Sequence, residues 1–142
     1  LACQVFAKDM IDRGTNGSII NIASLSGMTA LSRVFTYSAT KAAVINLTQN
    51  LAREFAQYGI RVNSVHPGGM WTAMGGKGSL SEEEMNKAVY ANFPIPRVGQ
   101  PEEVAAVILF LATDEASYST GSEFVADGGW FAGMRNPMMP SS

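Results

Sequence analysis

Three short apolar runs, each followed by turn-forming residues, alternate along this 142-residue chain with longer helix-like segments. The first run, residues 18–24, contains the nearly continuous β-branched stretch Ile19, Ile20 and Ile22, which is typical of a strand covered on both faces and predicts a central parallel strand. The other two runs, residues 60–66 and 123–126, end at glycine-rich turns. Connections of helix length join parallel strands, so the pattern predicts an α/β fold.

The segments between these runs have helical features. Residues 2–13 place apolar side chains four positions apart and are followed by glycine, and residues 37–58 form a long, small and apolar helix that also ends at glycine. Ser81 and Glu84 form a capping box for a short helix that reaches about residue 92, and Pro101 starts another helix. Residues 71–80 are glycine-rich and without periodicity, which predicts a mobile loop and, with the short helix, a lid.

This order of elements predicts a doubly wound parallel sheet of about three strands with flanking helices. A parallel sheet of that size leaves an apolar edge that another element must cover. Leu1, moreover, falls inside a helical pattern. We therefore expect residues 1–142 to be the C-terminal portion of one domain whose N-terminal part lies outside this sequence.

Composition narrows the function classes. The hydrophobic fraction of 46% is that of a globular protein, and a net charge of −2 with mixed signs leaves no cationic stripe for nucleic acid. No apolar run reaches the roughly 18 residues that a membrane helix needs, so we expect no membrane partner. The lone Cys3 suits a reducing compartment, which favours the cytoplasm. His66 is the only histidine and lacks companion ligands, so we interpret it as structural and expect no metal site.

Three polar side chains stand out beside this framework. Tyr37 and Lys41 are four positions apart at the start of the long helix, which puts them on one face about one turn from each other. A lysine ammonium favours the charged form of a neighbouring phenol, so such a tyrosine could act as acid or base at neutral pH. Ser24 lies at the predicted carboxyl end of a strand, where ligands of open α/β sheets bind. Taken alone, however, this tyrosine–lysine spacing is common on ordinary helix surfaces.

These residues occur within sequence stretches that together resemble the short-chain dehydrogenase/reductase family over almost the whole chain. The stretches are residues 17–24 (GSIINIAS), 37–43 (YSATKAA), 59–68 (GIRVNSVHPG), 70–72 (MWT), 97–105 (RVGQPEEVA) and 121–129 (GSEFVADGG). They occur in the family's order and at its spacing. The resemblance implies a Rossmann-like fold, of which this chain supplies the C-terminal half.

The resemblance also implies an NAD- or NADP-dependent interconversion of a carbonyl and an alcohol. Tyr37 would exchange the proton, Ser24 would hydrogen-bond the substrate oxygen, and Lys41 would hold the nicotinamide ribose while tuning the tyrosine. The same likeness assigns a larger set of neighbouring residues. Cofactor contacts are expected from Tyr37, Lys41, Pro67, Gly68, Gly69, Met70 and Thr72, and substrate-pocket contacts from Ser26, Trp71 and Met74.

The sequence departs from the family pattern in one respect: it holds no glycine-rich dinucleotide turn. Two function classes therefore stay open, a reductase whose other half lies outside this sequence and a catalytically silent fragment or assembly module. The family resemblance further implies a homodimer or homotetramer. A Met-rich tail, residues 131–142, either covers a pocket or neighbour or frays. The identity of the small-molecule substrate and the choice between NAD and NADP do not follow from the sequence.

Overall fold

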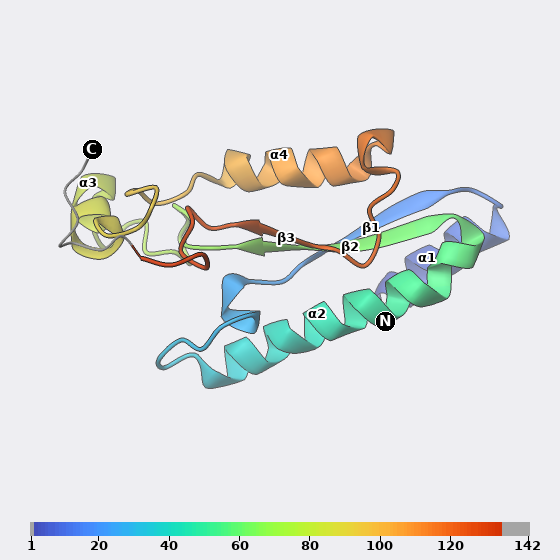
Figure 1. The fold of residues 1–142 in the computed structure, drawn as a ribbon, viewed down its shortest axis with the longest axis horizontal. Helices are drawn as coiled ribbons and strands as arrows, with labels where there is room; N and C mark the ends of the chain where they lie inside the picture. Colours follow the sequence, from blue (N-terminus) through green and yellow to red (C-terminus); the bar gives the residue numbers. More distant parts are fainter. Residues whose placement is uncertain (1, 135–142) are drawn as a thin grey trace.

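The computed structural model describes residues 2–134 as one layered α/β unit (Figure 1). Its elements are α1 (Ala2–Asp12), β1 (Gly17–Ile22), η1 (Leu25–Gly27), α2 (Phe35–Phe55), η2 (Ala56–Tyr58), β2 (Ile60–Pro67), α3 (Glu82–Met85), η3 (Asn86–Tyr90), α4 (Pro101–Ala112), η4 (Asp114–Ala116) and β3 (Glu123–Ala126). The three strands form one parallel sheet in the order β1-β2-β3. The predicted α/β class with a three-stranded parallel sheet is confirmed.

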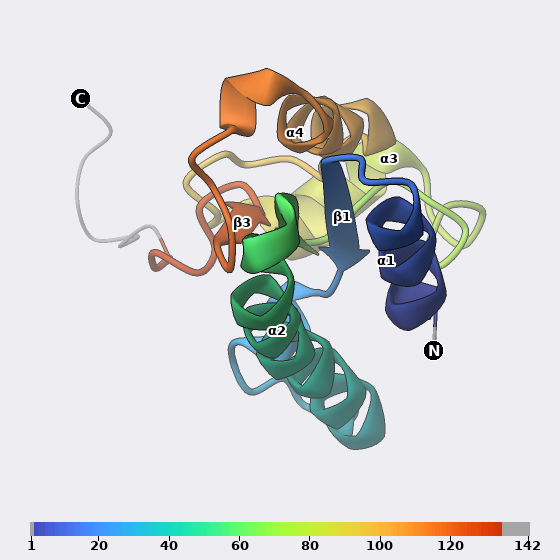
Figure 2. The same ribbon diagram turned by 90° about the vertical axis from the view of Figure 1, so that its right-hand side faces the viewer.

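One prediction about this sheet is wrong. The 18–24 run was expected to be a central strand, but β1 lies at the edge and β2 is central. Helices cover both faces of the sheet, α4 on one side and α1 with α2 on the other (Figures 1 and 2). A strand covered on both faces has a continuous apolar run whether or not both of its edges are paired, so the pattern could not fix the strand order.

Two apolar clusters sandwich the sheet. On the face covered by α1 and α2, Ala7 of α1 and Ala52 of α2 pack on Ile60 and Val62 of β2. On the opposite face, Val104 and Leu111 of α4 pack on Val65 of the central strand. Because β2 contributes to both clusters, the two helical layers hold this strand between them.

The turn before β2 depends on a glycine. Gly59 adopts a left-handed conformation with φ of 70°, which closes the α2–η2 helix and returns the chain into the sheet. The predicted helix over 37–58 is thus an α-helix that starts two residues earlier and finishes as a 3-10 turn. This return sets the strand register in which Ile22 of β1 lies beside Val65 of β2.

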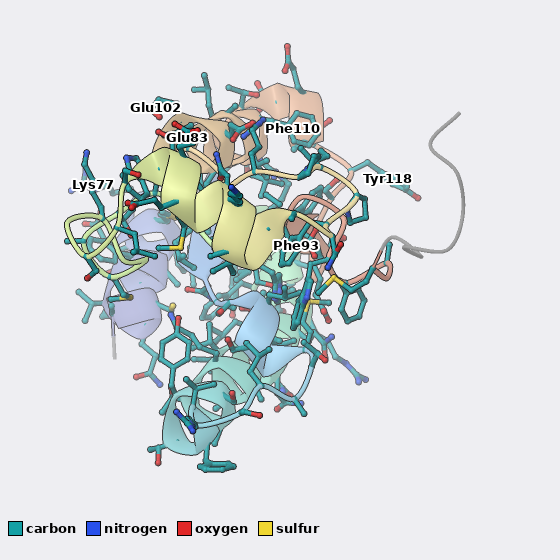
Figure 3. All side chains as sticks on the ribbon, turned by 90° about the vertical axis from the view of Figure 1, so that its left-hand side faces the viewer. Lys77, Glu83, Phe93, Glu102, Phe110 and Tyr118 are labelled. Carbon is teal, nitrogen blue, oxygen red and sulfur yellow. The ribbon has the colours of Figure 1, made fainter. Side chains whose placement is uncertain are left out.

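At the carboxyl ends of the strands lies a third cluster, formed by Met85, Tyr90, Phe93 and Val98. Figure 3 views this end of the molecule, with α3 in front and Lys77, Glu83 and Glu102 on its outer rim. The predicted short helix over 81–92 is an α-helical turn that continues as a π-helix from Asn86 to Tyr90. Residues 81–93, the helical part of the predicted lid and the segment called the lid below, thus contribute to a core of their own.

Candidate active site

Ser24 sits where the first strand passes into a tight turn. The strand itself ends at Ile22, and Ser24 is the N-cap of η1. Its side chain is buried, and its Oγ accepts a hydrogen bond of 3.1 Å from the Ser26 main-chain nitrogen. Since that bond occupies an acceptor position, the hydroxyl hydrogen of Ser24 stays available as a donor.

The η1 turn is pressed against α2 at the level of Lys41. A side-chain carbon added at Gly27 would lie 2.7 Å from the Lys41 carbonyl carbon, so only glycine allows this approach. The close contact brings the turn that carries Ser24 beside the first turns of α2. The sequence predicts both the strand-end serine and the tyrosine–lysine pair, and Gly27 explains why the two come together.

Tyr37 and Lys41 face one another on α2 as their spacing predicts. The Lys41 Nζ lies 5.6 Å from the centre of the Tyr37 ring, within the range of a cation–π contact. The same Nζ donates a 2.9 Å hydrogen bond to the Ile22 carbonyl at the end of β1. Tyr37 itself is 39% exposed. Lys41 therefore links the tyrosine to the strand end.

The segment that follows β2, residues 67–72, runs past the same end of the sheet. Gly68 donates from its main-chain nitrogen to the Ala126 carbonyl, and Gly69 accepts from the Gly99 main-chain nitrogen. The Thr72 Oγ1 accepts from the Gly75 main-chain nitrogen at 3.1 Å, so its hydroxyl hydrogen is not used in that bond. This segment is called the cofactor segment below, after the prediction that it contacts the nicotinamide.

The three predicted pocket residues have different surroundings. Ser26 is buried in η1, next to Ser24. Trp71 packs against the lid cluster, whereas Met74 is 90% exposed and is not brought to the others. A cavity of about 180 Å³ lies nearby, lined in part by Met70, Tyr90 and Arg97, but none of Ser24, Tyr37 and Lys41 lines it.

His66 is completely buried on β2, as a structural histidine should be. Its Nε2 lies 2.8 Å from the Ser64 Oγ, while its Nδ1 makes no hydrogen bond of ordinary geometry. Burial lowers the pKa of His66, and this effect outweighs the opposing influences of the nearby Ser24 backbone and the Glu123 charge. Among residues 2–134, no group of three or more metal-binding side chains gathers.

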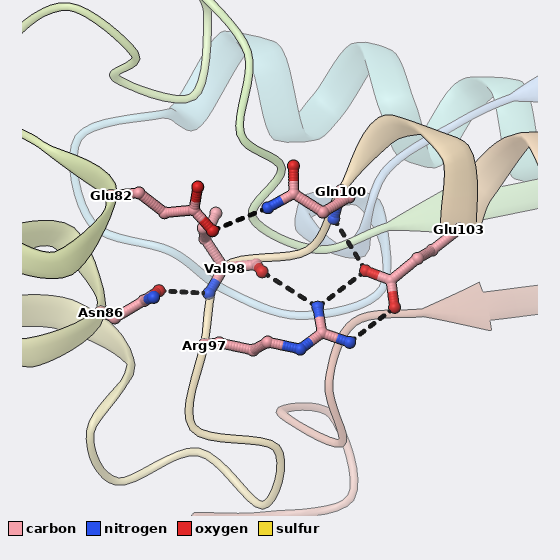
Figure 4. Close-up of polar contacts among 6 residues, drawn as sticks. All are labelled: Glu82, Asn86, Arg97, Val98, Gln100 and Glu103. Atoms are coloured by element: carbon pink, nitrogen blue, oxygen red, sulfur yellow. Dashed lines mark hydrogen bonds and ion pairs between the residues drawn. The ribbon is translucent and has the colours of Figure 1, made fainter.

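Sequence reasoning missed a set of polar contacts between the lid and the start of α4. Asn86 and Glu82 of the lid bond to Val98 and Gln100, and Arg97 pairs with Glu103 (Figure 4). The pair holds the pKa of Glu103 down to about 2, chiefly through the hydrogen bond from Arg97. Of these contacts, only the one between Gln100 and Glu103 could be predicted from the sequence, because a glutamate at the third helical position is typical of a capping box.

Two further observations bear on the predicted setting of the chain. No helix within residues 2–134 combines the length and the apolar character needed to cross a membrane. Of the Met-rich tail, Met134 is half-exposed, whereas Met138 and Met139 lie outside the described residues.

Comparisons with known proteins converge on one group. The family model described as enoyl-(acyl carrier protein) reductase matches residues 1–131. Cyclohexanol dehydrogenase of Acinetobacter sp. (strain SE19) is 45% identical over 114 residues, which cover 80% of this chain and 43% of that protein. The NAD-dependent glycerol dehydrogenase of Listeria innocua is 41% identical over 132 residues, 92% of this chain and 50% of that protein.

A solved structure agrees in fold as well as in sequence. The structure of 4-hydroxyisoleucine dehydrogenase complexed with NADH superposes with a TM-score of 0.81 at 36% identity, over 93% of this chain and 54% of that one. The chain thus spans about half the length of the curated relatives it matches.

Proposed function

Because the chain belongs to the short-chain dehydrogenase/reductase family, we propose that the whole protein is an NAD- or NADP-dependent oxidoreductase. It interconverts a small-molecule carbonyl and a secondary alcohol, and this chain supplies the residues that handle the proton. The observation that carries the proposal is the position of the Lys41 ammonium, over the Tyr37 ring and bonded to the end of β1.

The donors at this site fit a nicotinamide cofactor. A lysine ammonium has three N–H donors, and the Ile22 carbonyl takes one of them. The remaining donors of Lys41, with the Tyr37 hydroxyl, suit the ribose hydroxyls of the cofactor. Main-chain groups of Pro67, Gly68, Gly69 and Met70 and the Thr72 hydroxyl would hold the nicotinamide. The bound cofactor supplies a hydride donor or acceptor at its nicotinamide ring.

We assign the chemical roles of Tyr37, Lys41 and Ser24 from the donor and acceptor atoms that their internal hydrogen bonds leave unused. In the reduction, Tyr37 donates its phenolic proton to the carbonyl oxygen, and in the oxidation it takes the proton back from the alcohol. Lys41 stabilises the phenolate between these steps. Ser24 directs its unused hydroxyl hydrogen at the same oxygen, where negative charge develops. Ser26 and Trp71 border the substrate, and Met74 does so only if its loop moves inward.

The proposal extends to the state of the protein in the cell. Phe110 of α4 and Val125 of β3 are exposed apolar side chains, which suits burial between copies in a homodimer or homotetramer. The lone cysteine fits the cytoplasm. A nucleic acid is not a proposed partner, since the net charge is −2, and no membrane partner is proposed, since no apolar run is long enough to span a bilayer.

A substrate panel tests the activity. Full-length protein would be mixed with NADH or NADPH and, one at a time, with cyclic ketones, keto sugars, ketosteroids and 3-oxoacyl thioesters. The corresponding alcohols would be mixed with NAD⁺ or NADP⁺, and the change in reduced cofactor would be followed by absorbance in both directions. We expect turnover with at least one carbonyl and a preference for one of the two cofactors. Absence of turnover with every pair, in both directions of reaction, would favour the alternative of a catalytically silent module.

A further inference from the structure

The cofactor segment is not held by the sheet alone. Gly99 donates from its main-chain nitrogen to the Gly69 carbonyl at 3.0 Å and accepts from the Trp71 main-chain nitrogen at 2.8 Å. Residues 97–100, called the bridge here, therefore meet this segment in an isolated parallel β-bridge between Met70 and Gly99. Any movement of the bridge moves the backbone that the proposed function assigns to the nicotinamide.

The same bridge holds the lid. The Val98 main-chain nitrogen donates a 2.6 Å hydrogen bond to the Asn86 Oδ1, and the Gln100 Nε2 donates one of 2.8 Å to the Glu82 Oε1 (Figure 4). Val98 is completely buried, so its N–H has no access to water and depends on Asn86 as a partner. Asn86 is the first residue of the π-helix, a conformation that often marks functional sites.

The bridge is in turn fastened to the scaffold. Both outer nitrogens of Arg97 donate to the Glu103 carboxylate, at 2.8 and 2.6 Å, and Glu103 also accepts from the Gln100 main-chain nitrogen. A bidentate pair of this kind fixes direction as well as distance. On the other side of the lid, the Tyr90 hydroxyl lies so close to Gly69 that a side-chain carbon there would overlap it.

From these contacts we propose that Asn86 is a positioning residue that couples the lid to the cofactor segment through the bridge. Its carboxamide oxygen fixes the lid at one distance from residues 67–72, and so sets the affinity for substrate and for cofactor together. The proton chemistry of Tyr37 and Lys41 lies outside this network and is left unchanged. This inference rests on the proposed function.

The experiment compares three variants of the full-length protein. Asn86→Leu keeps the size of the side chain and removes the acceptor, Asn86→Asp keeps an acceptor oxygen, and Asn92→Leu is the control on the exposed end of the same lid. The measurements are KM and kcat for the carbonyl found in the panel, the Kd of NADH or NADPH, and hydrogen–deuterium exchange of residues 81–93 without ligand.

We expect Asn86→Leu to raise KM and Kd about tenfold, because a buried amide loses its partner, and to speed exchange in the lid. The kcat of Asn86→Leu should stay within about threefold of the wild-type value. For Asn86→Asp and Asn92→Leu, KM and Kd should also stay within about threefold of wild type. Should Asn86→Leu fail to fold, Gln100→Met removes the second lid contact without orphaning an amide, and both constants should then rise about threefold.

Unchanged KM and Kd, a loss confined to kcat, or an aspartate variant as impaired as the leucine variant would each overturn the positioning role. The exchange measurement needs no cofactor, so it shows whether Asn86 holds the lid even when the protein is inactive. A wild-type protein without turnover whose lid nevertheless exchanges faster after Asn86→Leu would refute the proposed function while supporting the coupling.

Discussion

At the scale of single residues, the candidate site depends on residues that bring separate elements together. Lys41 reaches from α2 to the Ile22 carbonyl of β1, and Gly27 allows the turn after β1 to touch α2. His66 lies on the adjacent strand, where its pKa is influenced by the Ser24 backbone. Lys41 and Gly27 each bring together elements that carry residues with a proposed chemical role.

The pH dependence of folding tests the environment of His66. Burial holds the pKa of folded His66 below the ordinary histidine value of about 6.5, so the unfolded chain binds the proton more readily. The free energy of unfolding should therefore be highest above about pH 6.5 and fall as the pH drops below it, down to the folded pKa. Urea unfolding of full-length wild type and His66→Gln at several pH values measures this. In His66→Gln, the free energy of unfolding should fall less steeply as the pH drops. An equal pH dependence in both proteins would contradict the argument from burial.

At the scale of elements, α4 is held to the sheet by a side chain at its last turn. Leu111 is completely buried and packs with Val65 and Val104. Leu111→Ala should lower the free energy of unfolding by about 2–5 kcal/mol, because it leaves a cavity that the two layers cannot close. Leu80→Ala, at a site that is 41% exposed before α3, should change it by about 0.5 kcal/mol or less. Denaturant unfolding followed by circular dichroism compares the two, and equal losses would mean that this layer is not tightly packed.

Elements with local signals could be predicted from the sequence, and those set by long-range contacts could not. The strand at 123–126 and the capping box at Ser81 were predicted correctly, since turn residues and caps act over a few positions. The edge position of β1 and the Asn86–Val98 bond depend on how separate segments meet in space. The facing of Tyr37 and Lys41 was predictable from helix geometry, but the bond from Lys41 to β1 was not.

At the scale of the whole molecule, a single sheet between two layers of helices places most of the proposed functional residues at one end. The η1 turn, the start of α2, the cofactor segment and the lid all follow or face the carboxyl ends of parallel strands (Figures 1 and 3). Ile22 on the edge strand is 43% exposed, and the sequence analysis predicts further chain along this edge. That covering segment remains a prediction.

Tyr37 is the residue on which the proposed reaction depends most directly. The decisive measurement is the rate of cofactor oxidation by full-length Tyr37→Phe, compared with wild type and with Tyr58→Phe, a half-exposed tyrosine on η2 that serves as the matched control. We predict a loss of about 10²- to 10⁴-fold for Tyr37→Phe, with cofactor binding retained, and wild-type rates for Tyr58→Phe. A Tyr37→Phe protein that turns over substrate at the wild-type rate would contradict the assignment of this phenol as the acid and base of the reaction.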